Sequence, residues 1–381
     1  MNVILIELVA GIIFLLYGLC ILGLSYGWQK LKKSPSLPSG STPETHVSIV
    51  IAVRDEEENI DMLLRHLAKQ EYPLHLFEII LADDHSQDNT LKIIDQLKLE
   101  SDLNIRVIHN APQEVGKKAA LNKGMLKAKG ELLITTDADC TMGKYWLRSM
   151  VAFYEKEQPY LIMGPVLYKT YTKKAFERFQ VLEFFSLLAA SAGAAGLNRP
   201  LFCNAANMAF NREIINTLND PLSSETPSGD DTMLLLSIKK EYPGKIRFNN
   251  DRYALVETFP EKTWRDFWNQ RKRWVSKSKY YHDFDIIFAS FMVFVTNLLL
   301  IVFLILMCFS SLFIDYFIAF FILKLLIDSL FLFPVIHYFK KYDVLPVYLP
   351  LQILYPFYAI TTALGGKFSG FKWKNRYYHV N

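Results

Sequence analysis

Long apolar runs near the two ends of the chain enclose a middle segment in which short apolar runs alternate with polar ones. Val3 to Tyr26 is almost uninterrupted apolar sequence, and a bilayer core needs about 20 helical residues to cross. Ile286 to Ile314 and Tyr316 to Tyr338 are two further runs, and we expect them to form an out-and-back hairpin with its turn at Asp315. The pattern therefore predicts an integral membrane protein.

Basic residues flank these runs and indicate their orientation. Lys30, Lys32 and Lys33 follow the first run, a basic cluster precedes the hairpin, and Lys340 and Lys341 follow it. Because positively charged flanks stay on the cytoplasmic side, we expect all of these ends to be cytoplasmic. A cleaved signal peptide is the alternative for the first run, but no basic residue precedes that run and no small-residue cleavage site closes it.

A third apolar stretch near the end of the chain is harder to interpret. Val344 to Gly366 contains Pro346, Pro350 and Pro356, and several basic residues follow it. If this stretch crossed the membrane, the basic tail would lie outside. We therefore expect a re-entrant or interfacial segment with a cytoplasmic tail, and a spanning helix is the alternative.

Two further features concern the membrane part. Lys324 and Asp328 lie four residues apart in the second arm of the hairpin, so that they can pair on one helix face away from lipid. Phe176 to Leu188 is apolar with interspersed charges. We expect this segment to be an amphipathic helix on the membrane surface, with a buried core helix as the alternative.

The middle segment has the rhythm of an α/β domain. It follows a Pro/Ser/Thr-rich linker and alternates strand-like and helix-like patterns without an internal repeat. Such alternation predicts a mostly parallel sheet with helices on both faces. The expected strands are His46–Val53, Phe77–Ala82, Ile105–His109 and Leu132–Thr136, and the expected helices are Asn59–Lys69, Asn89–Leu97 and Lys117–Lys127.

Composition and charge agree with a membrane-bound protein that does not bind nucleic acid. Hydrophobic residues make up 51% of the chain and charged residues 21%. The net charge of +4 is modest and concentrated at the membrane flanks, which indicates orientation and attraction to anionic lipid. The four cysteines show no metal-binding or disulfide spacing, and free thiols suit the cytosol.

Two carboxylates mark the end of the last expected strand of the middle segment. Asp137 and Asp139 follow Leu132–Thr136 and are one residue apart, so that they face the same way. Ligands of α/β sheets bind outside the carboxyl ends of the strands. There, a hard divalent cation can bridge the two acids to the phosphates of a substrate. The alternative is an Asp-rich turn that caps the next helix.

Two other strand ends also carry acids. Arg54, Asp55 and Glu56 follow the first strand, and Asp83 and Asp84 end the second. Acids gathered at one sheet edge repel each other unless a cation or a hydrogen-bonding ligand is present, so this edge is the predicted binding site. Helix capping explains the polar residues after Asp84 better than it explains Asp83 and Asp84 themselves.

A glycine and a lysine open the helix at Lys117. Gly116-Lys117-Lys118-Ala-Ala-Leu-Asn122 is a plausible grip on phosphate, because backbone N–H groups and a lysine both favour anions at a helix start. Lysines at solvated helix starts are also common, so this stretch is a weak signal by itself.

In combination, the motifs resemble family 2 glycosyltransferases of the GT-A fold. The resemblance rests on Ser48-Ile-Val-Ile51 with Arg54-Asp-Glu56, on Asp83-Asp84, on the Gly116 stretch and on Asp137-Ala-Asp139. Three later motifs extend the resemblance, which covers about Val47 to Lys279: Asn204-Ala-Ala-Asn207, Gly229-Asp230-Asp231 and Gln270-Arg-Lys-Arg273-Trp274.

The last of these motifs is similar to the Gln-x-x-Arg-Trp signature of membrane-bound members, such as cellulose, chitin and hyaluronan synthases and ceramide glucosyltransferase. Three positions depart from the family pattern. Ala52 replaces a common Pro, Asp55 a frequent Asn, and Asp230 the usual Glu. None of these changes removes a needed functional group, but they leave donor preference less defined.

The resemblance implies roles for the donor side of the site. Arg54, Glu56 and Asp83 or Asp84 would line the nucleoside pocket. Asp137 would act on the ribose and diphosphate side, and Asp139 would bind Mg²⁺ or Mn²⁺ directly. Lys117 would help to hold the diphosphate.

It also implies roles for the acceptor side. Asp231 would be the general base, with Asp230 and Asn207 nearby, although a turn and helix N-cap is the alternative for this acidic motif. Gln270 and Arg273 would lie over the diphosphate, and Trp274 would stack on the acceptor sugar or at a lipid entrance. A basic, aromatic juxtamembrane belt is the alternative for these three residues.

The leading hypothesis is therefore an inverting, metal-dependent glycosyltransferase with a cytoplasmic catalytic domain. It would use a nucleotide sugar, with a UDP-sugar as the expected donor, and a lipid or membrane-associated glycan as acceptor. We expect a transmembrane anchor (residues 1–27), a linker (28–45), a GT-A domain with interfacial helices (46–285), a transmembrane hairpin (286–338), and a proline-containing membrane segment with a basic tail (339–381).

Three alternatives remain at this stage. A processive polysaccharide synthase would use the same chemistry, although the small number of spans favours a single transfer. A non-catalytic nucleotide-binding scaffold is a second, against which the complete set of acids argues. A nucleotidyltransferase is a third, and it would release pyrophosphate. Protein partners and oligomeric state are not indicated by the sequence.

Overall fold

The chain folds into two compact units whose segments interleave along the sequence. The computed structural model describes residues 3–31, 43–172, 174–218, 230–368, 371–373 and 376–378. One unit, here called the sheet unit, comprises Leu31–Lys169 and Pro200–Pro260. The other, the helical unit, comprises Met1–Lys30, Thr170–Arg199 and Glu261–Asn381. The expected domain of residues 46–285 is thus shared between both units, and most of the expected linker lies outside the described residues.

A seven-stranded sheet forms the core of the sheet unit. The first four strands in spatial order run parallel. The fifth strand, β8 (Met208–Asn211), is antiparallel to both of its neighbours, and the last two, β6 (Leu161–Met163) and β9 (Ile246–Phe248), pair in parallel. This arrangement confirms the expected mostly parallel α/β sheet. In spatial order the strands are β3 (Ile105–His109), β2 (Phe77–Asp83), β1 (Val47–Val53), β4 (Leu132–Thr135), β8 (Met208–Asn211), β6 (Leu161–Met163) and β9 (Ile246–Phe248).

A smaller three-stranded sheet adjoins the end of β4 in sequence. Its order is β5 (Thr141–Met142), β10 (Val256–Thr258) and β7 (Val166–Tyr168). β10 pairs with β5 in antiparallel and with β7 in parallel orientation. This pairing brings Thr258, which is distant in sequence, close to the residues that follow β4.

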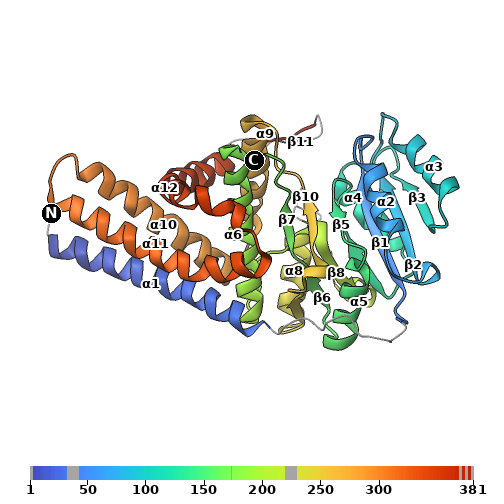
Figure 1. Ribbon diagram of the computed structural model, residues 1–381, viewed down its shortest axis with the longest axis horizontal. Helices are drawn as coiled ribbons and strands as arrows, with labels where there is room; N and C mark the ends of the chain where they lie inside the picture. Colours follow the sequence, from blue (N-terminus) through green and yellow to red (C-terminus); the bar gives the residue numbers. More distant parts are fainter. Residues whose placement is uncertain are drawn as a thin grey trace. The chain divides into compact units, whose positions relative to one another are not determined.

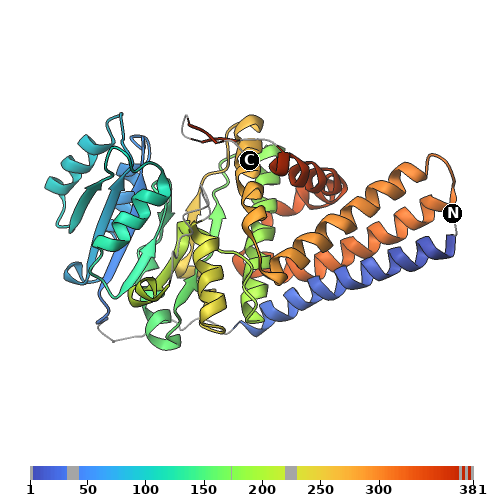
Figure 2. The same ribbon diagram turned by 180° about the vertical axis from the view of Figure 1, so that it is seen from behind.

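Helices cover both faces of the large sheet, as Figures 1 and 2 show. Their apolar sides account for the packing: in α2, Ile60, Leu63, Leu64 and Leu67 are buried, at the spacing of one helical face. The helices of this unit are α2 (Ile60–Ala68), α3 (Thr90–Glu100), α4 (Lys117–Lys127), α5 (Trp146–Glu157), α7 (Arg212–Thr217) and α8 (Asp230–Glu241).

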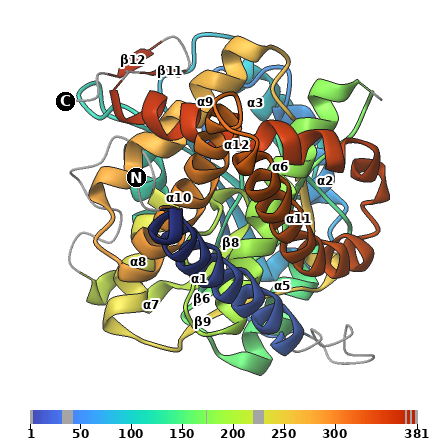
Figure 3. The same cartoon turned by 90° about the vertical axis from the view of Figure 1, so that its left-hand side faces the viewer.

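The helical unit contains α1, α10 and α11 side by side (Figures 1 and 3). Five helices in the described residues are long and apolar enough to cross a membrane, namely Ile4–Lys30, Ala175–Gly196, Phe284–Leu306, Leu312–Phe339 and Tyr342–Gly366. The elements of the unit are α1 (Val3–Lys30), α6 (Ala175–Gly196), α9 (Trp264–Ser276), α10 (Phe284–Leu306), α11 (Leu312–Phe339) and α12 (Leu345–Phe368), with the strand pair β11 (Phe371–Trp373) and β12 (Arg376–Tyr378).

Three predictions concern helices of this unit, and the prediction for the turn between α10 and α11 is wrong. The turn between α10 and α11 comes before Asp315, which lies in the first turn of α11, where a negative charge is favourable. The region from Leu345 to Phe368 is one continuous helix that contains Pro350 and Pro356. In α6, 72% of an 18-residue apolar stretch is buried, which fits the alternative of a buried helix for this segment.

The expected pair in α11 is present and belongs to a larger polar cluster. Lys324 Nζ lies 2.6 Å from Asp328 Oδ2, and both side chains are buried. Tyr17 of α1 donates to Asp328 at 2.6 Å, and Lys324 donates to Gln352 of α12 at 3.0 Å. The cluster thus connects α1, α11 and α12 through hydrogen bonds that compensate the burial of the two charges.

Candidate active site

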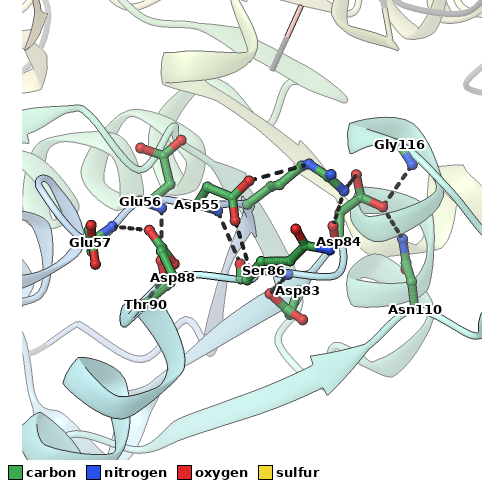
Figure 4. Close-up of polar contacts among 12 residues, drawn as sticks. Asp55, Glu56, Glu57, Asp83, Asp84, Ser86, Asp88, Thr90, Asn110 and Gly116 are labelled. Atoms are coloured by element: carbon green, nitrogen blue, oxygen red, sulfur yellow. Dashed lines mark hydrogen bonds and ion pairs between the residues drawn. The ribbon is translucent and has the colours of Figure 1, made fainter. Parts of the chain in front are cut away.

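Strand register brings the first two acidic segments to one edge of the large sheet. Val53, the last residue of β1, pairs with Asp83, the last residue of β2. Asp83 in turn pairs with His109 at the end of β3. Because the three strands are parallel, the residues that follow them emerge at the same edge, as Figure 4 shows for the loops after β1 and β2.

The loops after β1 and β2 are held together by crossed hydrogen bonds (Figure 4). The backbone N–H groups of Asp55, Glu56 and Glu57 donate to Ser86, Thr90 and Asp88. In return, Gln87 N–H donates to Asp55 at 2.8 Å. Asp55 has a positive φ of 49°, which Asp tolerates better than most residues. These bonds fix the backbone from which Arg54 and Glu56 project.

Asp84 is directed into the protein. Its side chain accepts hydrogen bonds from Gly116 N–H at 2.8 Å and from Asn110 at 3.2 Å, and Arg54 lies 3.6 Å away. Gly116 has a φ of 106°, which favours glycine, and α4 begins at the next residue. Asp84 therefore holds the loop that presents Lys117. Asp83 is also buried and accepts from Ser86 N–H at 3.2 Å.

Asp137 and Asp139 follow β4 and have different surroundings. Lys117 Nζ lies 2.5 Å from Asp137 Oδ1, and both side chains are about one-third exposed (28% and 32%). Asp139 accepts a hydrogen bond from Thr258 of β10 at 3.0 Å. Burial and then the charge of Asp137 raise the pKa of Asp139 to about 6, and Glu56 adds to the rise. A cation placed here would relieve the repulsion among these acids.

The two acids Asp137 and Asp139 have the chemistry to bind a magnesium or manganese ion. Within the described residues, no group of three or more His, Cys, Asp or Glu side chains could hold a metal by itself. Mg²⁺ is usually bound by one or two carboxylates together with water and substrate phosphates, so a pair of acids suffices. The carboxylate oxygens of Asp137 and Asp139 are of the hard type that this ion prefers.

The acidic motif at α8 is described only in part. Gly229 lies outside the described residues, and Asp230 is the first residue of α8. Asp231 accepts hydrogen bonds from Thr232 N–H at 2.7 Å and from Ala205 N–H at 3.3 Å. Asp231 thus lies beside the segment between Cys203 and Met208, and its role toward an acceptor stays a prediction.

Asn207 does not have the acceptor-side position that the sequence predicts. The residue is fully buried, and its amide nitrogen donates to the carbonyl oxygens of Pro165 at 2.8 Å and Ala254 at 2.7 Å. Its amide oxygen accepts from Trp146 at 3.0 Å. Since both N–H donors are used inside the fold, Asn207 holds the segments just before β7 and β10 and does not face an acceptor.

The residues Gln270, Arg273 and Trp274 lie on α9 of the helical unit. Thr263 caps this helix by accepting from Asp266 N–H at 3.2 Å. The Trp274 ring packs on the Arg271 guanidinium, whose carbon lies 4.3 Å from the ring centroid. The structure thus brings Arg54, Glu56, Asp83 and Asp84 to one sheet edge, whereas the meeting of that edge with the α9 residues stays a prediction.

Two residues of interest had no motif in the sequence. Thr258 binds Asp139 from a position 119 residues further along the chain. Glu183 pairs with Arg271 from within the apolar helix α6. An acid in the middle of an apolar helix is a usable signal, because a buried acid needs a partner, but a threonine in a short strand gives no such signal.

Comparison with known proteins identifies the family of a region that covers most of the sheet unit and also α6. Residues 48–218 match the family described as Glycosyl transferase family 2. These residues form a family 2 glycosyltransferase domain. A relative of this domain, the beta-monoglucosyldiacylglycerol synthase of Trichormus variabilis, is 34% identical over 120 residues, which are 31% of this chain and 25% of the relative. The probable glycosyltransferase YdaM of Bacillus subtilis is 26% identical over 245 residues, 61% of this chain and 55% of the relative.

A solved structure confirms the fold of the glycosyltransferase domain. The mannosyltransferase PcManGT from Pyrobaculum calidifontis, in complex with GDP-Man and Mn²⁺, has a TM-score of 0.53 and 14% identity. The match covers 84% of this chain and 97% of that one. The matched regions span 25% and 55% of the lengths of the two curated relatives, which is less than two thirds of each.

Proposed function

We propose that the chain is a membrane-bound inverting glycosyltransferase. It moves a sugar from a nucleotide sugar, with UDP-sugars as first candidates, to a lipid or membrane-associated acceptor. The observation that carries this proposal is the arrangement of Asp137 and Asp139, which follow β4, with Lys117 at the start of α4 in a family 2 glycosyltransferase domain. Five helices suited to a membrane support the location, and the basic flanks support a cytoplasmic active site.

On the donor side, Asp139 and Asp137 would hold Mg²⁺ or Mn²⁺. When bound, a divalent ion would neutralise the negative charge that develops on the leaving diphosphate. Lys117, 2.5 Å from Asp137, adds a positive charge to the same place. Arg54, Glu56 and Asp83 would contact the nucleoside. Asp84 would act through the loop at Gly116, whose N–H it accepts.

On the acceptor side, Asp231 would be the general base. Hydrogen bonds from Thr232 and Ala205 fix its carboxylate, so that it is oriented before the acceptor arrives. Asp231 would take the proton of the acceptor hydroxyl as the oxygen attacks the anomeric carbon opposite the diphosphate. A single displacement of this kind inverts the configuration. Arg273 would bind phosphate, and Gln270 and Trp274 would complete the site from α9.

A lipid acceptor with transfer of one sugar is the favoured version. The relative named beta-monoglucosyldiacylglycerol synthase carries a lipid in the name of its product. Few candidate spans are present in the described residues, and a secretion channel normally needs more helices. The alternative is a processive polysaccharide synthase. Product size separates the two, because a ladder of products would indicate processive synthesis and one added sugar a single transfer.

The test is turnover of nucleotide sugars by the purified full-length protein in lipid nanodiscs. UDP-glucose, UDP-N-acetylglucosamine and GDP-mannose would each be supplied with diacylglycerol and Mn²⁺ or Mg²⁺, and free nucleoside diphosphate measured. We expect one donor to yield diphosphate, and chelation of the metal to stop it. Release of pyrophosphate would indicate a nucleotidyltransferase instead. Binding of nucleotide without turnover of any donor would favour the non-catalytic scaffold.

A further inference from the structure

A buried ion pair ties α9 to the interior of the helical unit. Arg271 is 1% exposed and Glu183 of α6 is 5% exposed. Arg271 Nη2 lies 2.5 Å from Glu183 Oε2, and Arg271 Nε lies 3.3 Å from Glu183 Oε1. Tyr358 of α12 donates its hydroxyl to Glu183 at 2.8 Å. Three helices therefore meet at one carboxylate.

Aromatic rings of α9 enclose the same guanidinium. Its carbon lies 4.4 Å from the centroid of Phe267 and 4.3 Å from that of Trp274. Phe267, Arg271 and Trp274 are spaced by four and three residues, so they share one face of the helix. The rotation of α9 about its axis is therefore fixed by the direction of Arg271.

Further polar contacts extend this network to Gln270. The Gln180 side chain of α6 exchanges two hydrogen bonds of 2.9 Å with the backbone of Glu261, just before α9. The Glu261 carboxylate accepts from the Gln270 amide at 2.7 Å. The Gln270 amide oxygen accepts from Arg271. Gln270 is thus held between Glu261 and Arg271.

The energetics of such a pair favour a role in orientation. Removing two charges from water is costly, and a buried ion pair often stabilises a fold no more than apolar residues of the same volume would. A bidentate arginine–carboxylate contact does, however, define geometry closely. The helical unit has a second buried pair, Lys324 and Asp328, that connects α11 with α1 and α12 and, among the described residues, does not contact α9.

We propose that Arg271 is a positioning residue, which, through Glu183 and Tyr358, sets the orientation of α9 and hence of Gln270 and Arg273. The inference rests on the proposed function, because Gln270 and Arg273 are the residues assigned to the diphosphate. Arg271 itself need not contact substrate. The same network links the orientation of α9 to α12, a candidate membrane helix.

The test compares two matched double variants in nanodiscs. Glu183→Gln with Arg271→Met removes one buried pair without leaving an unpaired charge, and Asp328→Asn with Lys324→Met does the same to the other. We expect only the first to lower kcat for the donor selected above, by about 10- to 100-fold. The first variant should also increase hydrogen exchange in the Trp264–Ser276 peptide, while both variants show similar changes in thermal midpoint.

Several outcomes would overturn the proposal. The proposal is wrong if the Glu183/Arg271 variant keeps both the wild-type kcat and the wild-type hydrogen exchange of the α9 peptide. It is also wrong if the two double variants lose activity equally. Should the double variant fail to fold, Tyr358→Phe removes a single hydroxyl and should give a smaller change of the same kind. Hydrogen exchange needs no turnover, so it decides the role of Arg271 even where the wild type shows no transferase activity.

Discussion

At the scale of single residues, Thr258 is a partner of the proposed metal ligand Asp139. Its hydroxyl donates to Asp139 Oδ2 at 3.0 Å. Loss of such an outer partner typically costs about 10- to 100-fold in metal affinity. We expect Thr258→Val to weaken Mn²⁺ binding in the presence of nucleotide by this factor, as measured by electron paramagnetic resonance. Thr258→Ser, which keeps the hydroxyl, is the control. Equal Mn²⁺ affinity in both variants would show that the bond is incidental.

Asp231 gives a second prediction at this scale. Asp231→Asn keeps the size of the side chain but removes the base, and general-base contributions are typically about 10²- to 10⁴-fold in rate. We expect this loss in kcat with unchanged binding of the nucleoside diphosphate by calorimetry. Asp61→Asn, which alters a half-exposed acid paired with Arg65, is the control for loss of a charge. Normal turnover in Asp231→Asn would assign the base to another group.

Single residues also illustrate which parts of the candidate site can be predicted from the sequence. Asp137 and Asp139 were found because a strand that ends in acids is a local pattern. Asn207 was misassigned because the motif does not reveal that Trp146, Pro165 and Ala254 occupy its amide. These partners come from distant parts of the chain, so their contacts exist only once the two sheets have formed.

At the scale of elements, α1 and α6 approach closely at glycine. A Cβ on Gly27 would collide with the carbonyl oxygen of Gly193, whereas a Cβ on Gly11 of the same helix would meet nothing within 4 Å. Gly27→Ala should therefore force the helices apart, and overpacking of this kind costs about 1–3 kcal/mol. We expect a lower thermal midpoint for Gly27→Ala in detergent and no loss for Gly11→Ala. Equal midpoints would mean that the contact is not as close as described.

Element boundaries were predicted well where the pattern is periodic. β3 and α4 have the expected limits, and β1, β2 and β4 differ by one residue. The prediction of a turn at Asp315 is wrong. An uninterrupted apolar run does not indicate where a turn lies, and the single charge of Asp315 does not mark the turn. An acid in the first turn of a helix is equally consistent with the sequence and is what α11 has.

At the scale of the whole molecule, the orientation in the membrane can be tested with native cysteines. Cys308 is exposed in the turn after α10, and Cys203 lies in the sheet unit. If the basic flanks are cytoplasmic, Cys308 lies on the opposite side of the membrane. We expect a membrane-impermeant maleimide to label Cys308 in intact cells, and Cys203 only after permeabilisation. Cys308→Ser is the control, and labelling in the reverse order would invert the topology.

The interleaving of the two units limits how this enzyme domain can be studied by itself. The chain leaves the sheet unit after Lys169, returns at Pro200 and leaves again after Pro260. Trimming the ends would therefore leave α6 as an apolar helix without its neighbours, and such a fragment should aggregate. A water-soluble form of the sheet unit requires the excision of residues 170–199 and their replacement by a polar bridge. Because Arg273 lies beyond Pro260, this fragment should serve to measure nucleotide binding but not sugar transfer.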